Sequence, residues 1–207
     1  MVTILYWTIP LLKPFSQACN NNRDSILSVL RPLLVDSTTV LEIGSGTGQH
    51  GVYFAEHLPH IHWQTSDLCD NHDGIIEWIE ESELGNIAKP IELDVSLPLN
   101  HTSTYSAIFT ANTLHIMNLA TAESCLEKTA QLLMSGGLLI VYGPFKYEGQ
   151  FTSESNAGFD QWLKTHDPER GIRDFERIHA LLEKNHFKLI KDHKMPANNQ
   201  LIVWQKE

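Results

Sequence analysis

Short runs of apolar and β-branched residues alternate with longer segments of helical hydrophobic spacing along most of the chain. This alternation is typical of parallel strands joined by crossover helices, so it predicts an α/β fold. We expect helices over residues 18–30, 47–57, 73–83 and 121–133, and strands over 39–43, 61–66, 91–95, 105–111 and 138–142. The last of these strands is apolar throughout, which is typical of a strand covered on both faces of a parallel sheet.

The C-terminal third predicts a different local arrangement. A segment rich in Gly and Ser (143–156) predicts a loop, and helices are expected near 158–164 and 174–184. Two final strands, 187–194 and 201–205, are separated by the turn residues Pro196–Asn199. A strand, a turn and a second strand at the end of a parallel sheet predict an antiparallel edge.

Length and charge narrow the class of protein. The 207 residues show no repeat or linker, so we expect a single domain over 1–207, with residues 1–12 as an N-terminal extension. The formal net charge of −10 argues against nucleic-acid binding, which depends on Lys and Arg. No apolar stretch approaches the ~20 residues needed to span a bilayer. Three widely spaced cysteines indicate neither disulfides nor a thiolate metal site, and a cytoplasmic location fits best.

The most specific motif is a buried strand that runs directly into a glycine-rich loop, VLEIGSGTG at residues 40–48. Its glycines, Gly44, Gly46 and Gly48, allow positive φ and close approach of a ligand. The helix that follows offers free N–H groups to a polar ligand. Asp67 ends the next strand, where a carboxylate can accept hydrogen bonds from ribose hydroxyls. The motif therefore predicts a nucleoside site.

Two nucleoside ligands fit this pattern, NAD(P) and S-adenosylmethionine (SAM). Gly46-x-Gly48-x-x-Gly51 matches the dinucleotide fingerprint, but it starts two residues after the expected end of the strand. Glu42, just before the turn, favours SAM, because its carboxylate would lie near the cationic amino-acid end and would repel a pyrophosphate. A tight packing turn without ligand is the third interpretation.

More polar residues follow other strands at the same edge of the sheet. Asp94 closes the third strand, where it would accept a bond from an adenine amino group or cap a loop. Asn112 follows the fourth strand and Tyr142 ends the fifth. Ligands of open α/β sheets bind beyond the carboxyl ends of the strands, so we expect these residues to line one crevice, with Asn112 beside the cofactor.

Together these motifs resemble the class I SAM-dependent methyltransferases. More narrowly, the chain resembles a domain-of-unknown-function family that includes methyltransferase-like protein twenty-six. The matching stretches lie from Lys13 onward and include KPFSQACNNNRDSIL, VLEIGSGTGQHGVYFAEHLP, WQTSD, FTANTLHIM, GGLLIVYGPFKYEGQFTSESNAGFD, GIRD and MPANNQLIVW.

The resemblance implies a Rossmann-like, seven-stranded, mostly parallel sheet with helices on both faces, an antiparallel C-terminal strand, and SAM as cofactor. Carried over by position, it implies that the methionine end of SAM is held by Glu42, Gly44, Gly46 and Gly48. It assigns the ribose to Asp67 and the adenine to Asp94. It supplies no substrate.

Catalytic roles follow from the chemistry of methyl transfer, which requires a positioned acceptor and, for a hydroxyl or an ammonium, a base. We predict that His115 and Tyr142 are the catalytic residues, with His115 as the base; the alternative for His115 is a polar residue that caps or packs the turn. Loop 143–151 would form a lid whose aromatic wall includes Phe145.

Arg23 and Asn198 are further candidates for substrate contact. Arg23 would bind a carboxylate, or is a surface arginine beside a helix cap. Asn198 would reach the substrate, or simply provides the positive φ of a turn.

Metal and nucleic-acid chemistry are not predicted. His57, His60 and His62 span a helix end, a turn and a strand, which scatters their imidazoles, so we expect no metal site. Residues 112–115 lack the Asn-Pro-Pro-aromatic pattern expected for methylation of flipped bases.

The sequence thus predicts a SAM-dependent methyltransferase, with a small-molecule acceptor favoured over a protein. An NAD-dependent oxidoreductase and a non-catalytic SAM-binding module are the rivals. Neither the acceptor nor the oligomeric state follows from the sequence.

Overall fold

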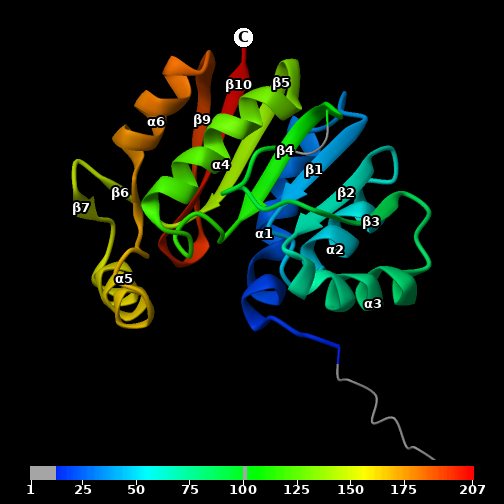
Figure 1. Cartoon of the computed structure of the whole chain (residues 1–207), viewed down its shortest axis with the longest axis horizontal. Helices are drawn as coiled ribbons and strands as arrows, with labels where there is room; N and C mark the ends of the chain where they lie inside the picture. Colours follow the sequence, from blue (N-terminus) through cyan, green and yellow to red (C-terminus); the bar gives the residue numbers. More distant parts are fainter. Residues whose placement is uncertain (1–12, 100–101) are drawn as a thin grey trace, which may run out of the picture.

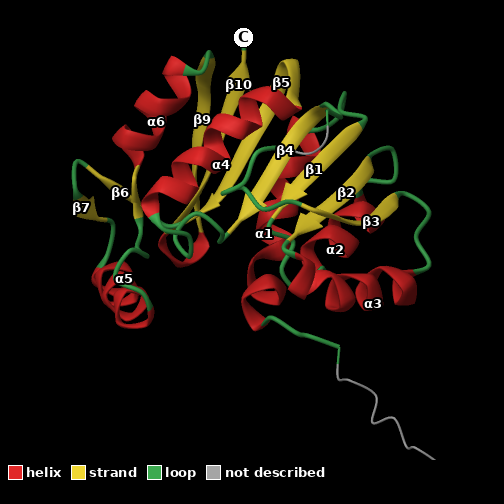
Figure 2. Ribbon diagram, viewed as in Figure 1, coloured by secondary structure: helices red, strands yellow, loops and turns green. Residues whose placement is uncertain are grey.

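A computed structural model describes residues 13–99 and 102–207, so the expectation about residues 1–12 lies outside the described part. The main sheet has seven strands in the order β3-β2-β1-β4-β5-β10-β9. Their bounds are β1 Thr39–Ile43, β2 His62–Asp67, β3 Ile87–Glu92, β4 Tyr105–Ala111, β5 Leu133–Gly143, β9 Phe187–Met195 and β10 Asn199–Lys206. β1 to β5 pair in parallel, while β10 is antiparallel to both β5 and β9. This confirms the predicted fold class (Figures 1 and 2).

β9 and β10 form the predicted antiparallel pair at one edge of the sheet, and the reversed strand β10 is the inner member of this pair. β10 lies between β5 and β9, so β9 forms the edge. Residues 200–204 of β10 are all buried, whereas β9 alternates between exposed and half-buried positions after Phe187. An apolar strand is favoured in the covered interior and a lysine-rich strand at the edge, which explains the order.

Helices cover both faces of the sheet. α1 (Gln17–Leu33), α2 (Gln49–His57) and α3 (His72–Ser82) pack on one face, where their apolar side chains meet those of Val40, Phe109 and Val203. α4 (Leu119–Leu132) and α6 (Phe175–Lys184) cover the other face, against Leu41, Ile108 and Trp204 (Figure 1). Alternate residues of each strand thus feed two separate cores.

Several boundaries differ from the expected ones, and two of the larger differences affect the main sheet. β3 begins at Ile87 and ends at Glu92, because its pairing with β2 starts at Trp63 and Ile87. The expected strand over 91–95 therefore falls mostly in the loop that follows. The expected helix break near residues 135–137 belongs to β5, which starts directly after α4.

The segment predicted as a loop over 143–156 instead contributes two strands to a second, small sheet. β6 (Phe145–Tyr147) pairs antiparallel with β7 (Gln150–Phe151) and parallel with β8 (Arg173–Asp174). Glu148 and Gly149 both have positive φ, as a two-residue hairpin turn requires. α5 (Glu154–His166) follows and lies beside this sheet (Figure 1).

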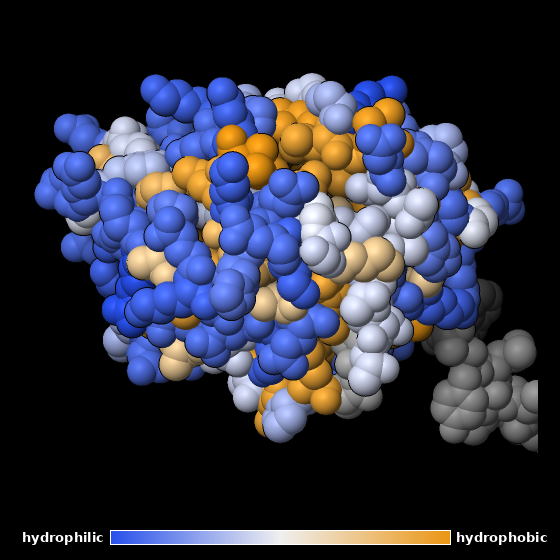
Figure 3. All heavy atoms as spheres, turned by 90° about the horizontal axis from the view of Figure 1, so that it is seen from above, coloured by the Kyte–Doolittle hydropathy of each residue, from blue (hydrophilic) through white to orange (hydrophobic). Residues whose placement is uncertain are grey.

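Hydrophilic side chains cover most of the face seen in Figure 3, and apolar side chains gather there in limited areas. Within residues 13–99 and 102–207, no helix combines the length and the apolar character that crossing a bilayer demands.

Candidate functional site

A cavity of about 480 Å³ opens at the carboxyl ends of the parallel strands. Its walls come from the loops after β1, β2, β3 and β4 and from the first turn of α1. This is the edge at which open α/β sheets bind their ligands, and the volume lies within the range of ~300–1,000 Å³ that is usual for small-molecule sites. Of the residues predicted from the sequence, Gly44, Gly46, Asp67, Asp94 and Asn112 line it.

The three glycines of the loop differ in what surrounds them. A Cβ on Gly44 would lie 2.7 Å from Cγ2 of Thr113, and one on Gly48 would lie 3.0 Å from Cα of Ile75. A Cβ on Gly46 would meet no atom within 4 Å, because this residue faces open space in the cavity wall. Gly44 and Gly48 are therefore packing positions, and Gly46 leaves room for a ligand.

Asp67 connects the loop after β2 to the glycine-rich loop. Its Oδ2 accepts a hydrogen bond from Gly46 N at 2.7 Å, and its Oδ1 accepts from Leu68 N at 2.8 Å and from Asn71 Nδ2 at 2.7 Å. These donors hold the carboxylate at the cavity wall, where it can exchange the Gly46 bond for ligand hydroxyls.

Glu42 does not line the cavity. The side chain is buried beneath the loop, where Oε2 accepts from Ser45 Oγ at 3.0 Å and from Trp63 Nε1 at 3.1 Å. A Cβ on Gly51 would approach this same oxygen to 2.8 Å, so Gly51 is needed for the packing of α2 on the strand. Burial raises the pKa of Glu42 to about 7. The geometry supports a role in shaping the loop rather than direct contact with a ligand.

Asp94 and Asn112 both line the cavity, and local hydrogen bonds hold each of them in place. Asp94 Oδ1 accepts from Ser96 Oγ at 2.6 Å and from Ser96 N at 2.8 Å, and these bonds lower the pKa of Asp94. The loop-capping alternative is therefore present in the structure. Asn112 has φ +56° and donates its backbone N–H to Tyr142 O at 2.9 Å, which joins the ends of β4 and β5.

His115 and Tyr142 are buried and lie outside the cavity-lining set. The His115 ring meets Phe159 of α5 edge to face, with centroids 5.2 Å apart. Burial, together with the charge of Arg173, lowers the pKa of His115 to about 4. Burial raises the pKa of Tyr142, and side-chain hydrogen bonds with Asn22 and Asn199 oppose that rise.

The three predicted substrate residues are dispersed. The Arg23 guanidinium lies over the Tyr53 ring, 4.5 Å from its centroid. Phe145 is buried in the core beneath α6, so it is no wall of an open lid. Asn198 has φ +57°, and its carbonyl accepts from Asn156 Nδ2 at 2.9 Å, which makes it a turn residue. None of the three lines the cavity.

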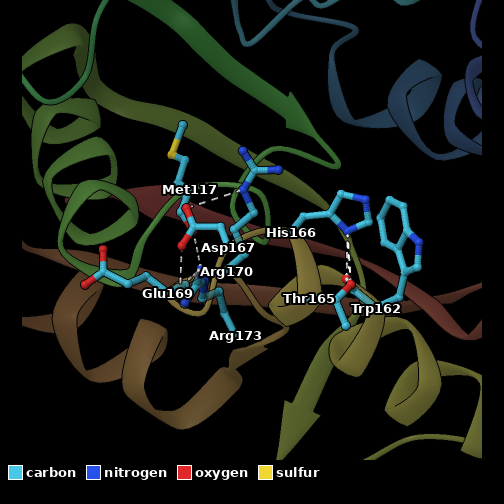
Figure 4. A network of polar contacts seen from close by, with 8 residues as sticks. All are labelled: Met117, Trp162, Thr165, His166, Asp167, Glu169, Arg170 and Arg173. Carbon is cyan, nitrogen blue, oxygen red and sulfur yellow. Dashed lines mark hydrogen bonds and ion pairs between the residues drawn. The ribbon is translucent and has the colours of Figure 1, made fainter.

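Other cavity residues were not predicted. Ser16 and Cys19 bring the start of α1 to the wall, and Thr113, Met117 and Arg170 complete the side toward α4. Ser16 caps α1 by accepting from Cys19 N, a signal that the sequence contains. Arg170 comes from a loop that is distant in sequence, where no local pattern marks it (Figure 4).

The histidines considered for metal binding make other contacts. Nδ1 of His57 lies 2.8 Å from Tyr53 O, and Nε2 of His60 lies 3.1 Å from Leu34 O. Across the described residues, no group of three or more His, Cys, Asp or Glu side chains has the arrangement of a metal site.

Solved structures of methyltransferases share this fold at low sequence identity. An O-methyltransferase family protein from Burkholderia thailandensis is 15% identical, with a TM-score of 0.76, over 89% of this chain and 58% of that one. Human N-acetylserotonin methyltransferase in complex with SAM is 17% identical, with a TM-score of 0.76, over 92% and 53%. An O-methyltransferase family 2 protein from Planctomyces limnophilus in complex with apigenin is 15% identical, with a TM-score of 0.73, over 84% and 52%.

The chain therefore spans between half and three fifths of the length of these three proteins. At these identities the likeness concerns the fold. A family defined by sequence matches much more of the chain, over residues 13–206. The chain belongs to the family described as Protein of unknown function (DUF938), and it shares its fold with SAM-dependent methyltransferases.

Proposed function

We propose that the protein transfers a methyl group from SAM to a small-molecule acceptor. The observation that carries the proposal is the cavity at the sheet edge, where Gly46 leaves open space and Asp67 presents a carboxylate anchored by neighbouring donors. The shared fold supports the same cofactor, because a structural neighbour contains SAM. The apigenin complex of another neighbour supports a small acceptor.

In this proposal the residues around the cavity bind successive parts of the cofactor. The loop of Gly44, Gly46 and Gly48 holds the methionine end, Asp67 accepts from the ribose, and the segment around Asp94 borders the adenine. Asn112 lies between these parts and the acceptor. Glu42 acts indirectly, because it fixes Ser45 beneath the loop.

SAM, when bound, supplies an electrophilic methyl group for an in-line displacement. The chain must hold the acceptor atom close to that group, and such positioning is worth up to ~7–11 kcal/mol. His115 is the proposed base. Its lowered pKa leaves the imidazole neutral near pH 7, with a nitrogen lone pair for the acceptor proton, although a pKa of about 4 makes it a weak base. Tyr142, near the end of β5, is the second proposed catalytic residue.

The strand order argues against a dinucleotide oxidoreductase. The dinucleotide-binding fold has the parallel order 3-2-1-4-5-6, whereas here the reversed β10 lies beside β5. Gly51, the third glycine of the alternative fingerprint, packs against the buried carboxyl of Glu42 rather than facing the cavity.

Incubation with methyl-labelled SAM and the small-molecule fraction of a cell extract tests catalysis. The wild type should transfer label, and His115→Ala should lose most of this transfer while binding S-adenosylhomocysteine as before. Binding of the cofactor product without any label transfer would support the non-catalytic SAM-binding module instead.

A further inference from the structure

A second hollow, of about 560 Å³, lies beside the cavity at the edge of the sheet. Arg170 belongs to the walls of both. In the second hollow, five cationic side chains and three carboxylates line the wall, although the chain as a whole has a formal net charge of −10. The cations are Lys146, Lys164, Arg170, Arg173 and Arg177, and the carboxylates are Glu123, Asp160 and Glu169.

Most of these cations already have partners. Lys164 Nζ pairs with Asp160 at 2.6 Å, and Arg177 Nε pairs with Glu123 at 2.6 Å. The Arg173 guanidinium donates to main-chain carbonyls, including Leu114 O at 3.0 Å and Met117 O at 2.5 Å.

Arg170 differs from them. Its Nε is buried and has no hydrogen-bond acceptor within the described part of the chain. The nearest carboxylate oxygen, Oδ2 of Asp167, is 3.7 Å away, beyond hydrogen-bond distance (Figure 4). The side chain as a whole is 39% exposed, so the guanidinium has only a weak partner in Asp167 and is accessible to a ligand from both adjoining hollows.

The loop that carries Arg170 is fixed against the cavity wall. Gly171 N donates to His115 O at 3.0 Å, and Arg170 N donates to Asp167 O at 3.0 Å. Arg173 ties the next residues to the loop after β4, as Figure 4 shows for its contact with Met117. The backbone of Arg170 is therefore held beside the segment that contains the proposed base.

We infer that Arg170 binds an oxyanion, a carboxylate or a phosphate, on the methyl acceptor. This inference rests on the proposed function. In the proposed binding mode, the carboxylate of the cofactor lies at the glycine-rich loop, next to α1 and α2. Arg170 lines the cavity on the α4 side, with Met117 and Thr121, so it would face the acceptor instead. A guanidinium suits oxyanions because its N–H groups match two oxygens at once.

The test compares Arg170→Gln with Arg31→Gln. Both remove one positive charge, but Arg31 is exposed in the last turn of α1, at the far end of that helix from Ser16 and Cys19. Thermal melting is measured with saturating S-adenosylhomocysteine while phosphate or acetate replaces chloride at constant ionic strength. The two anions distinguish a phosphate from a carboxylate preference.

We expect the wild type and Arg31→Gln to bind one of these anions in preference to chloride. Arg170→Gln should bind that anion roughly tenfold to a hundredfold more weakly, the usual size of one lost charge-assisted contact. Its melting temperature without ligands should stay within a few degrees of the wild type, because the guanidinium makes no hydrogen bond that the fold needs.

Three outcomes would overturn the inference: no anion preference in the wild type, a large loss of stability in Arg170→Gln, or weaker binding of S-adenosylhomocysteine by that variant. The last outcome would make Arg170 a cofactor contact. Failure of the wild type to bind S-adenosylhomocysteine would instead contradict the proposed function itself, so the two failures are distinguishable.

Discussion

Two neighbouring glycines provide the sharpest test of how the site is built. Gly44 and Gly46 both have positive φ, +73° and +58°, so replacement of either by alanine carries a backbone cost of about 1–2 kcal/mol. They differ in what the new Cβ meets. At Gly44 it would lie 2.7 Å from Thr113, whereas at Gly46 it would meet nothing within 4 Å.

The expected stability losses follow from these contacts. Gly46→Ala should lose only the backbone term, about 1–2 kcal/mol, or roughly 2–8 °C in melting temperature for a chain of this size. Gly44→Ala adds about 1–3 kcal/mol for displacing Thr113, so it should lose about 2–5 kcal/mol. Chemical denaturation measures both values.

Binding of S-adenosylhomocysteine should be weakened more by Gly46→Ala than by Gly44→Ala, the reverse of the order for stability. The methyl group of Gly46→Ala occupies ligand space, and overpacking of about 1–3 kcal/mol should weaken S-adenosylhomocysteine about 5-fold to 150-fold. Gly46→Val should abolish binding. Isothermal titration calorimetry on folded protein provides the measurement. If Gly46→Ala bound within twofold of the wild type, the assignment of this loop to the cofactor would be wrong.

Three further predictions concern the titratable residues of the site. Asp67→Ala should weaken S-adenosylhomocysteine by about 1–3 kcal/mol in calorimetry, whereas the exposed neighbour Asp70→Ala should not; equal effects would move the ribose elsewhere. Because the folded pKa of Glu42 is raised from 4.5 to about 7, its contribution to stability is complete below pH 4.5 and is lost as the pH rises to about 7. Glu42→Gln should therefore remove up to about 3 kcal/mol of this pH dependence in denaturant titrations, and an unchanged pH profile would contradict the burial of an ionisable carboxyl there. His115, with its pKa lowered to about 4, should show no NMR titration between pH 5 and 8, and a midpoint near 6.5 would contradict its buried position.

The sequence predicted the parts of the fold that depend on local pattern. The strands over 39–43 and 105–111 have the expected bounds, because their apolar runs are interrupted at both ends by polar or glycine residues. The position of β10 depends on which strand of the final pair forms hydrogen bonds with β5. That pairing joins residues far apart in the chain, so local sequence pattern does not determine it. The run LIVW at 201–204 contained the relevant signal, since four consecutive apolar residues favour a covered strand over an edge.

The candidate site was predictable only in part, for a related reason. Gly46, Asp67 and Asn112 reach the cavity because they follow strand ends, which a pattern of strands and loops can locate. Glu42 turns away because Trp63 and Ser45 offer donors beneath the loop, and this depends on side-chain packing. Arg170 arrives from the loop between α5 and β8 through tertiary hydrogen bonds, so no local motif predicts it.

The most direct test of the proposed function is a calorimetric titration of the purified protein with S-adenosylhomocysteine and, separately, with NAD⁺ and NADP⁺. We expect one molecule of S-adenosylhomocysteine to bind per chain, with binding weakened by Asp67→Ala, and no heat from either dinucleotide. Saturable binding of a dinucleotide, or no binding of S-adenosylhomocysteine by folded protein, would contradict the assignment of the cavity to SAM.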